Sequence, residues 1–132
     1  MALQLHPLST PTMSRDHRKL RVFHIADDLV LQVYRATAQF PVAERFGLQA
    51  QMRRAAVSSA SNIVEGCARR KQGEYLNFLN IASASASEVR YLVNLSLRLG
   101  FMPSADEERL AAKHSELIAG LQALIQSLDT SA

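Results

Sequence analysis

The residues best suited to chemistry are basic side chains grouped between positions 45 and 71. This segment has six Arg or Lys residues and one acid, Glu65, which gives a balance of +5. Guanidinium and ammonium groups bind phosphate oxygens, and such contacts give salt-sensitive affinity for nucleic acid without base specificity. The candidate contacts with RNA or DNA are Arg53, Arg54, Arg69, Arg70 and Lys71. A second interpretation stays open, because segment 104–132 has two basic and five acidic residues, a balance of −3, and the two segments would complement each other.

A polar set follows one side of the same segment at helical spacing: Arg54, Ser58, Asn62, Glu65 and Arg69. Glu65 precedes Arg69 by four positions, the favourable order for an ion pair on a helix. We expect Ser58, Asn62 and Glu65 to form a structural hydrogen-bonded network at a packing surface, with the arginines as donors. The alternative is that these arginines reach phosphate oxygens instead.

The other reactive side chains do not form a catalytic or metal-binding set. The four histidines are scattered, Cys67 is the single cysteine, and the glycines lack the spacing of a phosphate-binding loop. His114 falls on an apolar stripe, where we expect a core-edge residue, and Cys67 has no histidine near it in sequence to act as a base. The sequence predicts a protein that is not an enzyme and holds no metal or cofactor. An active site built at the central pore of an oligomer is the remaining alternative.

Composition indicates one soluble domain of helical type. At 132 residues the chain is long enough for one core but not for two. Hydrophobic residues make up 48% and charged residues 20%, which excludes the composition of a disordered chain, and the low aromatic content of 6% favours helix over strand. A lone cysteine fits a reducing compartment, and no apolar run approaches the roughly 18 residues that span a bilayer. We expect a cytoplasmic protein without a membrane partner.

Apolar residues recur at spacings of three and four, which is typical of amphipathic helices. The pattern predicts helices at about 17–39, 46–70, 74–99 and 104–129, separated at Pro41, at Gly73 and between Gly100 and Pro103. Short connections favour an all-α, antiparallel up-and-down four-helix bundle over residues 15–132. Residues 1–14 hold prolines among Ser and Thr without an apolar period, so we expect a flexible N-terminal tail. The core stripe predicted for the last helix is Leu110, His114, Leu117, Leu121, Leu124 and Leu128.

The second predicted helix carries two apolar arcs where a bundle needs one. The first arc, which includes Met52 and Ile63, faces the core, while the second consists of Val57, Ala60, Val64 and Cys67. Either this helix is buried more deeply than its neighbours, or the second arc meets another copy of the chain. We favour the second interpretation and expect a homo-oligomer.

The order of several motifs resembles the four-helix-bundle family of the 23S rRNA intervening-sequence proteins. The resemblance covers roughly Val22 to Leu128, and the stretches that carry it are FPVAERFGL at 40–48, QMRRAAVS at 51–58, SNIVEG at 61–66 and EYLNFLNIA at 74–82, followed by Ser85 and Glu88. The chain departs from the family pattern at Val64, where Ala is usual, and at Ser58-Ser59-Ala60-Ser61, a stretch that often contains Pro.

The resemblance implies a bacterial cytosolic bundle whose biochemical role is not established. Similar bundles form pentameric rings, so it implies a homopentamer. A related branch, the accessory variability determinant of diversity-generating retroelements, binds nucleic acid and a reverse transcriptase. On that resemblance Arg53, Arg54, Arg69 and Arg70 are candidates for nucleic-acid contact. The alternative function is a protein-binding adaptor for an enzyme such as a reverse transcriptase.

Overall fold

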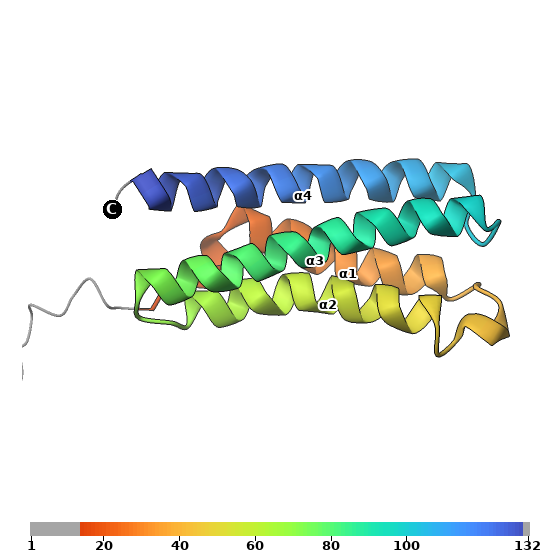
Figure 1. The fold of residues 1–132 in the computed structure, drawn as a ribbon, viewed down its shortest axis with the longest axis horizontal. Coiled ribbons are helices and arrows are strands. Elements are labelled where there is room, and N and C mark those ends of the chain that lie inside the picture. Colours follow the sequence, from red (N-terminus) through yellow and green to blue (C-terminus); the bar gives the residue numbers. More distant parts are fainter. Residues whose placement is uncertain (1–13, 131–132) are drawn as a thin grey trace, which may run out of the picture.

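A computed structural model describes residues 14–130, which fold entirely as helices and turns (Figure 1). Four long helices follow one another along the chain: α1 (Arg21–Thr37), α2 (Leu48–Cys67), α3 (Gln72–Arg98) and α4 (Ser104–Thr130). Two short 3-10 helices, η2 (His17–Lys19) and η3 (Val42–Glu44), precede α1 and α2. Within this described part of the chain there is no strand, so the predicted all-α class with four helices is confirmed. The flexible tail expected at residues 1–14 lies outside the described residues except for Ser14.

Local hydrogen bonds explain where the helices begin and end. The first helix begins at Arg21, four residues after the predicted start at position 17. The Asp16 carboxylate accepts the Arg18 backbone N–H at 3.0 Å and caps the short η2 helix, so residues 17–19 do not join α1. After Pro41 the chain makes the η3 turn, and the Glu44 carboxylate accepts the first α2 N–H, that of Leu48, at 3.1 Å. Gly100 ends α3 in the left-handed region at φ 79°. That conformation suits glycine and closes the helix end.

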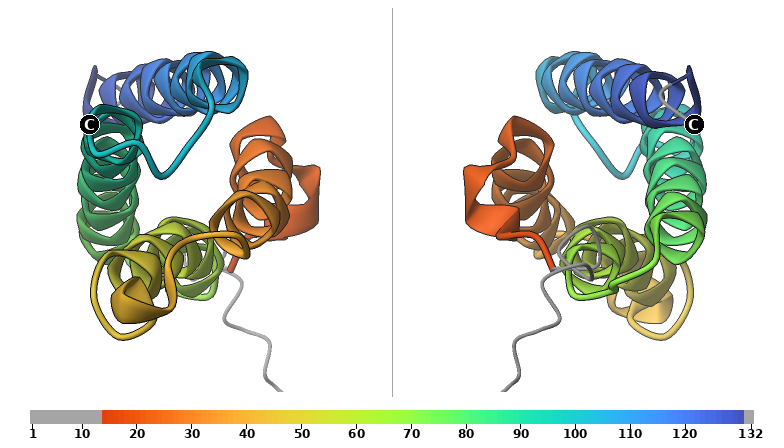
Figure 2. Two further views of the ribbon diagram at one scale, coloured as in Figure 1. Left: turned by 90° about the vertical axis from the view of Figure 1, so that its right-hand side faces the viewer. Right: turned by 90° about the vertical axis from the view of Figure 1, so that its left-hand side faces the viewer.

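Each helix packs against the helix that follows it in the chain, and α4 also packs against α1. Seen end-on, the four helices lie at the corners of a square (Figure 2). In Figure 1 the colours along α2 and α3 progress in opposite directions, as do those along α3 and α4. The closest pairing is between α2 and α3, where Gly66 lets the two backbones approach. A Cβ atom at Gly66 would lie 3.0 Å from the Cβ atom of Phe78 and 3.2 Å from the Tyr75 ring.

The core runs along the centre of this square. Its largest fully buried aliphatic side chains come from all four helices: Leu29, Met52, Ile63, Leu79, Leu110, Leu117 and Leu121. In α4 the predicted stripe is buried from Leu110 to Leu121, and His114 is inside the core rather than at its edge, with 1% exposure. Further along α4, Ile125 is buried while Leu124 and Leu128 are only half-buried. No described helix is long and apolar enough to cross a membrane.

Candidate nucleic-acid interface

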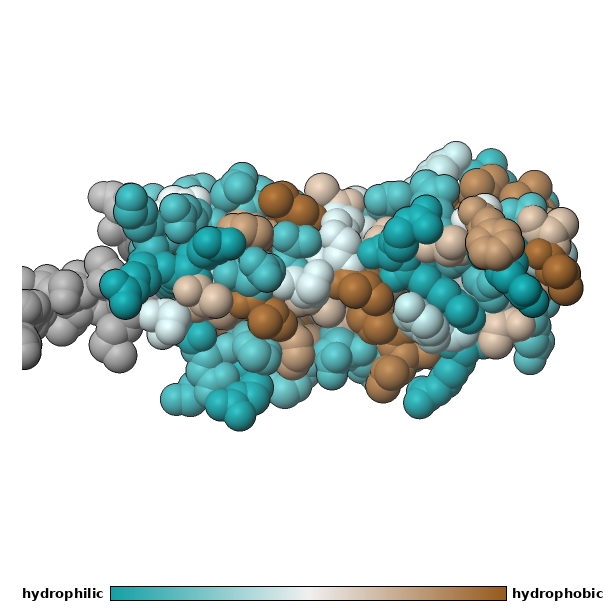
Figure 3. Space-filling view, turned by 90° about the horizontal axis from the view of Figure 1, so that it is seen from below, coloured by the Kyte–Doolittle hydropathy of each residue, from teal (hydrophilic) through white to brown (hydrophobic). Residues whose placement is uncertain are grey.

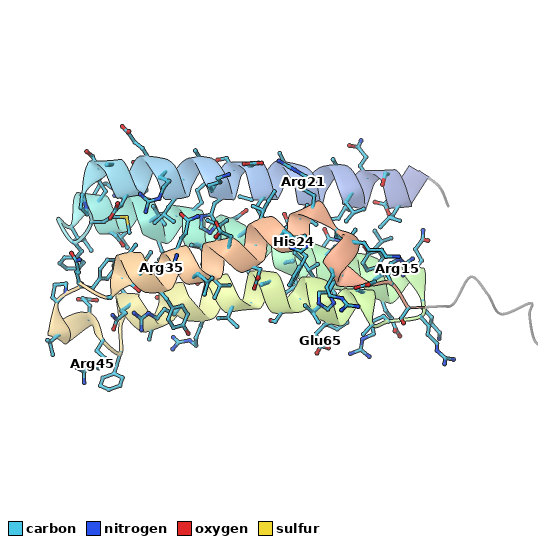
Figure 4. All side chains as sticks on the ribbon, turned by 180° about the vertical axis from the view of Figure 1, so that it is seen from behind. Arg15, Arg21, His24, Arg35, Arg45 and Glu65 are labelled. Atoms are coloured by element: carbon cyan, nitrogen blue, oxygen red, sulfur yellow. The ribbon has the colours of Figure 1, made fainter. Side chains whose placement is uncertain are left out.

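The basic residues of the α2 region fall into two separate groups. Arg53 and Arg54 lie in the first third of α2, whereas Arg69, Arg70 and Lys71 lie in the connection between α2 and α3. From Arg54 to its end at Cys67, α2 rises about 1.5 Å per residue, which places the two groups about 20 Å apart. In Figure 4, Arg45 lies at the end of the molecule that holds the α1–α2 connection, and Glu65, four residues before Arg69, lies towards the other end. The five predicted contacts therefore do not form one surface.

A groove of about 710 Å³ lies beside the first group. Its walls come from α1, from the α1–α2 connection and from α2, and its lining includes Tyr34, Arg45, Phe46, Arg53, Arg54 and Val57. No carboxylate belongs to this lining. The volume lies within the range of small-molecule and cofactor sites, but the groove is open to solvent. Figure 3 views the molecule from the α2 side and shows hydrophobic residues along this face and at the α1–α2 end, with hydrophilic residues between them.

Two aromatic residues of the groove were missed by the sequence interpretation. Phe46 is 88% exposed and Tyr34 is 42% exposed. Arg45 enters the sequence prediction through the net charge of segment 45–71 alone, and Phe46 has no predicted role of its own. The available signal was the placement of Phe46 directly after Arg45 in a Pro- and Gly-containing connection, where a large apolar side chain has no helix periodicity to bury it.

Arg53 is held in place by the end of α1. Its Nε donates to the Thr37 hydroxyl at 2.9 Å, its Nη2 donates to the Tyr34 carbonyl at 3.1 Å, and its guanidinium lies 4.4 Å from the centre of the Tyr34 ring. A cation at the C-terminus of a helix also interacts favourably with the unpaired carbonyl groups and the helix dipole. Arg53 therefore acts first as a structural contact between α1 and α2, which leaves Nη1 without a hydrogen bond to any described residue.

Arg45 and Arg54 are differently placed. Both are exposed, and neither makes a side-chain hydrogen bond or ion pair within residues 14–130. Their guanidinium groups are the free cationic groups of the groove, since Arg53 is largely occupied by α1. A positive groove with free arginines and exposed aromatic rings is suited to an anionic ligand that also has apolar or aromatic parts.

The second basic group has a different setting. Arg69 pairs with Glu65 at 3.3 Å, as the four-residue spacing suggested, and its guanidinium lies 4.9 Å from the centre of the Phe78 ring. Arg70 and Lys71 are exposed and make no side-chain hydrogen bond or ion pair within the described residues. This group has no exposed large hydrophobic residue close to it in the sequence.

The predicted polar network is divided in two. Ser58 shares a hydrogen bond of 2.8 Å with Ser85 of α3, and Asn62 donates to the Ser58 carbonyl at 2.8 Å and to its hydroxyl at 3.1 Å. The Ser58–Ser85 bond joins α2 to α3, in keeping with a network at a packing surface, while the Asn62 bonds stay within α2. Among residues 14–130, the Glu65 side chain pairs only with Arg69, in an exposed contact.

The predicted interface arc is also divided. Val57 is 40% exposed and Val64 is half-buried, but Ala60 is 8% exposed and Cys67 is 1% exposed. Ala60 and Cys67 are covered by the chain's own helices, so they offer no surface to a second copy in this structure. Burial also raises the pKa of the Cys67 thiol, which keeps it neutral, and Tyr75 and Arg15 lie beside it. Among the four predicted residues, Val57 is the exposed one.

His114 is the buried histidine among the described residues. Burial lowers the pKa of His114 below its ordinary value, and its Nδ1 pairs with the Leu110 carbonyl at 2.8 Å on the same helix. Residues 14–130 contain no group of three or more His, Cys, Asp or Glu side chains that could hold a metal ion.

Comparisons with known proteins agree with this fold. The sequence profile described as 23S rRNA-intervening sequence protein matches residues 18–123 of the chain. The structure is similar to the crystal structure of a Bacteroides thetaiotaomicron protein with unknown function from the S23 ribosomal protein family. The TM-score is 0.72 and the sequence identity 21%, and the match covers 79% of this chain and 97% of that chain. At this identity the likeness concerns the fold alone. Comparison with curated proteins gives no match.

Proposed function

This chain belongs to the 23S rRNA-intervening sequence protein family, and we propose that it is a non-enzymatic, homo-oligomeric bundle that binds RNA or DNA beside the N-terminal part of α2. The matched relative is described only as a protein of unknown function, so the proposal rests on the surface of this chain. We further propose that the protein is cytoplasmic and that its helices form an antiparallel up-and-down bundle, which the packing of each helix on its sequence neighbour supports.

One observation carries the nucleic-acid proposal: the groove beside α2 holds unpaired arginines and no acid. Arg45 and Arg54 are exposed, make no side-chain hydrogen bond or ion pair with any described residue, and share the groove with two exposed aromatic rings. An unpaired arginine can neutralise a phosphate without first breaking a contact within the protein. Of the five predicted contacts, Arg54 is the one that lines the groove with its guanidinium free.

The test is binding of labelled RNA and DNA oligonucleotides measured by fluorescence anisotropy at 50 and 200 mM salt. The double variant Arg45→Gln with Arg54→Gln removes two cationic groups from the groove. We expect weaker binding and a shallower salt dependence, with the slope of log K against log salt smaller by about 1.4 if two phosphate contacts to a single strand are lost. The control pair is Lys19→Gln with Arg98→Gln, two exposed residues that do not line the groove, which removes the same charge.

If the control pair weakens binding as much as the groove pair, the site is wrong, because affinity then follows net charge alone. A protein that binds neither RNA nor DNA at low salt contradicts the nucleic-acid proposal as a whole.

The oligomer proposal rests on exposed apolar side chains. Leu31 on α1 and Ile81 and Tyr91 on α3 lie outside the groove and are 50%, 40% and 59% exposed, and exposed large hydrophobic residues mark association sites. The family resemblance supports a pentamer. Light scattering coupled to size exclusion would measure the mass, and a monomer at micromolar concentration would contradict assembly.

The second candidate function is an adaptor that binds a protein, such as a reverse transcriptase. It is favoured by Phe46, whose exposed ring could serve a protein partner as well as a nucleic acid. Charge reversal separates the two functions. If Arg54→Glu abolishes partner binding and leaves nucleic-acid affinity unchanged, the adaptor is the better description.

A further inference from the structure

The exposed ring of Phe46 is the most unusual feature of the groove. At 88% exposure it is the most exposed large hydrophobic residue described in the chain. Its neighbours in the connection are well held: Phe40 is buried, and the Glu44 carboxylate binds the first N–H of α2. The ring is therefore presented to solvent by an ordered turn, and it contributes little to the core of this chain.

The second ring of the groove is already oriented by the protein. Arg53 lies over the Tyr34 ring and is itself bound to the Tyr34 carbonyl and the Thr37 hydroxyl. The Tyr34 ring thus has a guanidinium stacked against it, while 42% of the residue stays exposed. An aromatic surface held in this way needs no ordering when a ligand arrives.

Free positive charge lies next to both rings. Arg45 precedes Phe46 directly, and Arg54 contributes to the same lining from α2. Because no acid lines the groove, its charge is complementary to a ligand that combines phosphates with flat aromatic groups. Double-stranded nucleic acid presents its phosphates but keeps the faces of its bases stacked inside the helix, so it cannot use Phe46. A single strand can turn its bases outward and offers both groups at once.

We infer that the groove formed by α1, the α1–α2 connection and α2 binds single-stranded nucleic acid, with a base stacked on Phe46 and the neighbouring phosphates bound by Arg45 and Arg54. This deepens the proposed function and rests on it. Stacking accepts any base, because every base has a flat face, so the site selects for strandedness more than for sequence. Tyr34 lies on the α1 wall of the same groove and is positioned by Arg53.

The experiment compares affinities for a 12-nucleotide single-stranded RNA, its DNA equivalent and a duplex of the same length, using fluorescence anisotropy at constant salt. Phe46→Ala removes the ring, and Val42→Ala is the matched control, because Val42 is 79% exposed in the same connection but does not line the groove. We expect single strands to bind at least about tenfold more tightly than the duplex, and Phe46→Ala to weaken single-strand binding about tenfold or more. Val42→Ala should leave it unchanged.

Phe46→Leu adds a second check, since leucine keeps an apolar side chain without a π face, and it should also weaken binding. Circular dichroism should give the same melting temperature for all three variants as for the original chain, because neither residue is buried. The RNA and DNA arms show whether the 2′-hydroxyl contributes.

Three results would overturn the inference in distinguishable ways. Equal affinity for single strands and duplex, lost in Arg45→Gln with Arg54→Gln but kept in Phe46→Ala, refutes stacking and leaves the proposed function standing. Absence of binding to every oligonucleotide refutes both. If Phe46→Ala instead lowers the mass of an oligomer and leaves nucleic-acid affinity intact, the groove is an interface between copies of this chain.

Discussion

The close approach of α2 and α3 can be tested at Gly66. In Gly66→Ala the new Cβ atom would lie 3.0 Å from the Cβ atom of Phe78, 3.2 Å from Tyr75 Cδ1 and 3.4 Å from the Tyr75 carbonyl oxygen. These atoms cannot move aside easily. The Phe78 Cβ atom is attached directly to the α3 backbone, and the Tyr75 ring is 1% exposed with the Arg15 guanidinium 4.0 Å from its centre. The methyl group therefore has to push the two helices apart locally.

The expected magnitude is a balance of two effects. Adding a methyl group to a well-packed contact destabilises by about 1 to 3 kcal/mol. Replacing glycine by alanine in a helix stabilises by up to about 1 kcal/mol, and less near the helix end, where Gly66 lies one residue before the last residue of α2. We expect Gly66→Ala to lower the free energy of unfolding by about 1 kcal/mol, with a fall in melting temperature of a few degrees.

The matched control is Gly73→Ala. Gly73 lies in the first turn of α3, and a Cβ atom there would meet nothing within 4 Å. This variant has the same chemical change without the crowding, so it should be as stable as the original chain or slightly more stable. Urea unfolding followed by circular dichroism at one protein concentration measures both variants. If Gly66→Ala proves as stable as Gly73→Ala, α2 and α3 do not meet as closely as described.

Three further predictions concern single side chains. Burial lowers the pKa of His114 in the folded chain, so between this lowered pKa and the ordinary value of about 6.5 the unfolded chain binds a proton that the folded chain does not. The free energy of unfolding should therefore fall as pH decreases through this window. His114→Leu should flatten the dependence of the urea midpoint on pH. Arg53→Met should lower the free energy of unfolding by about 1 kcal/mol, because two hydrogen bonds to α1 are lost from a half-buried site. Arg54→Met should change the free energy of unfolding by less than about 0.5 kcal/mol. Equal effects of the two variants would show that Arg53 is not a structural contact. Glu65→Gln should change stability by less than about 0.5 kcal/mol, because its pair with Arg69 is exposed, and a larger loss in a urea titration would contradict this.

The helices could be predicted from the sequence because their apolar spacing repeats over many turns. The η2 and η3 turns could not, because they depend on single side-chain contacts. Asp16 binds the N–H of Arg18 and delays the start of α1, and Glu44 binds the N–H of Leu48 and sets the start of α2. Helical periodicity contains no information about such local competition for backbone groups.

The candidate site was only partly predictable for a similar reason. Arg53 and Arg54 are adjacent arginines that the sequence does not distinguish. Adjacent positions on a helix differ by a rotation of about 100°, which turns Arg53 towards the end of α1 and leaves Arg54 in solvent. The arc with Ala60 and Cys67 looked like free surface on a helical wheel, yet α2 has neighbours on two sides within the same chain. Phe46 carried no periodic signal, since it lies in a connection.

The connection between α1 and α2 is anchored at both ends by buried residues, while the side chains in its middle are exposed. At one end Phe40 is buried, and its ring centroid lies 5.8 Å from that of Phe101 in the α3–α4 connection. At the other end Leu48 is buried. Between them, Val42, Arg45 and Phe46 face solvent. Substitutions of these three exposed side chains should therefore leave the bundle intact. Replacing Val42, Ala43, Arg45 and Phe46, while keeping Pro41 and Glu44 to preserve the η3 turn and the start of α2, should yield folded proteins with altered ligand preference.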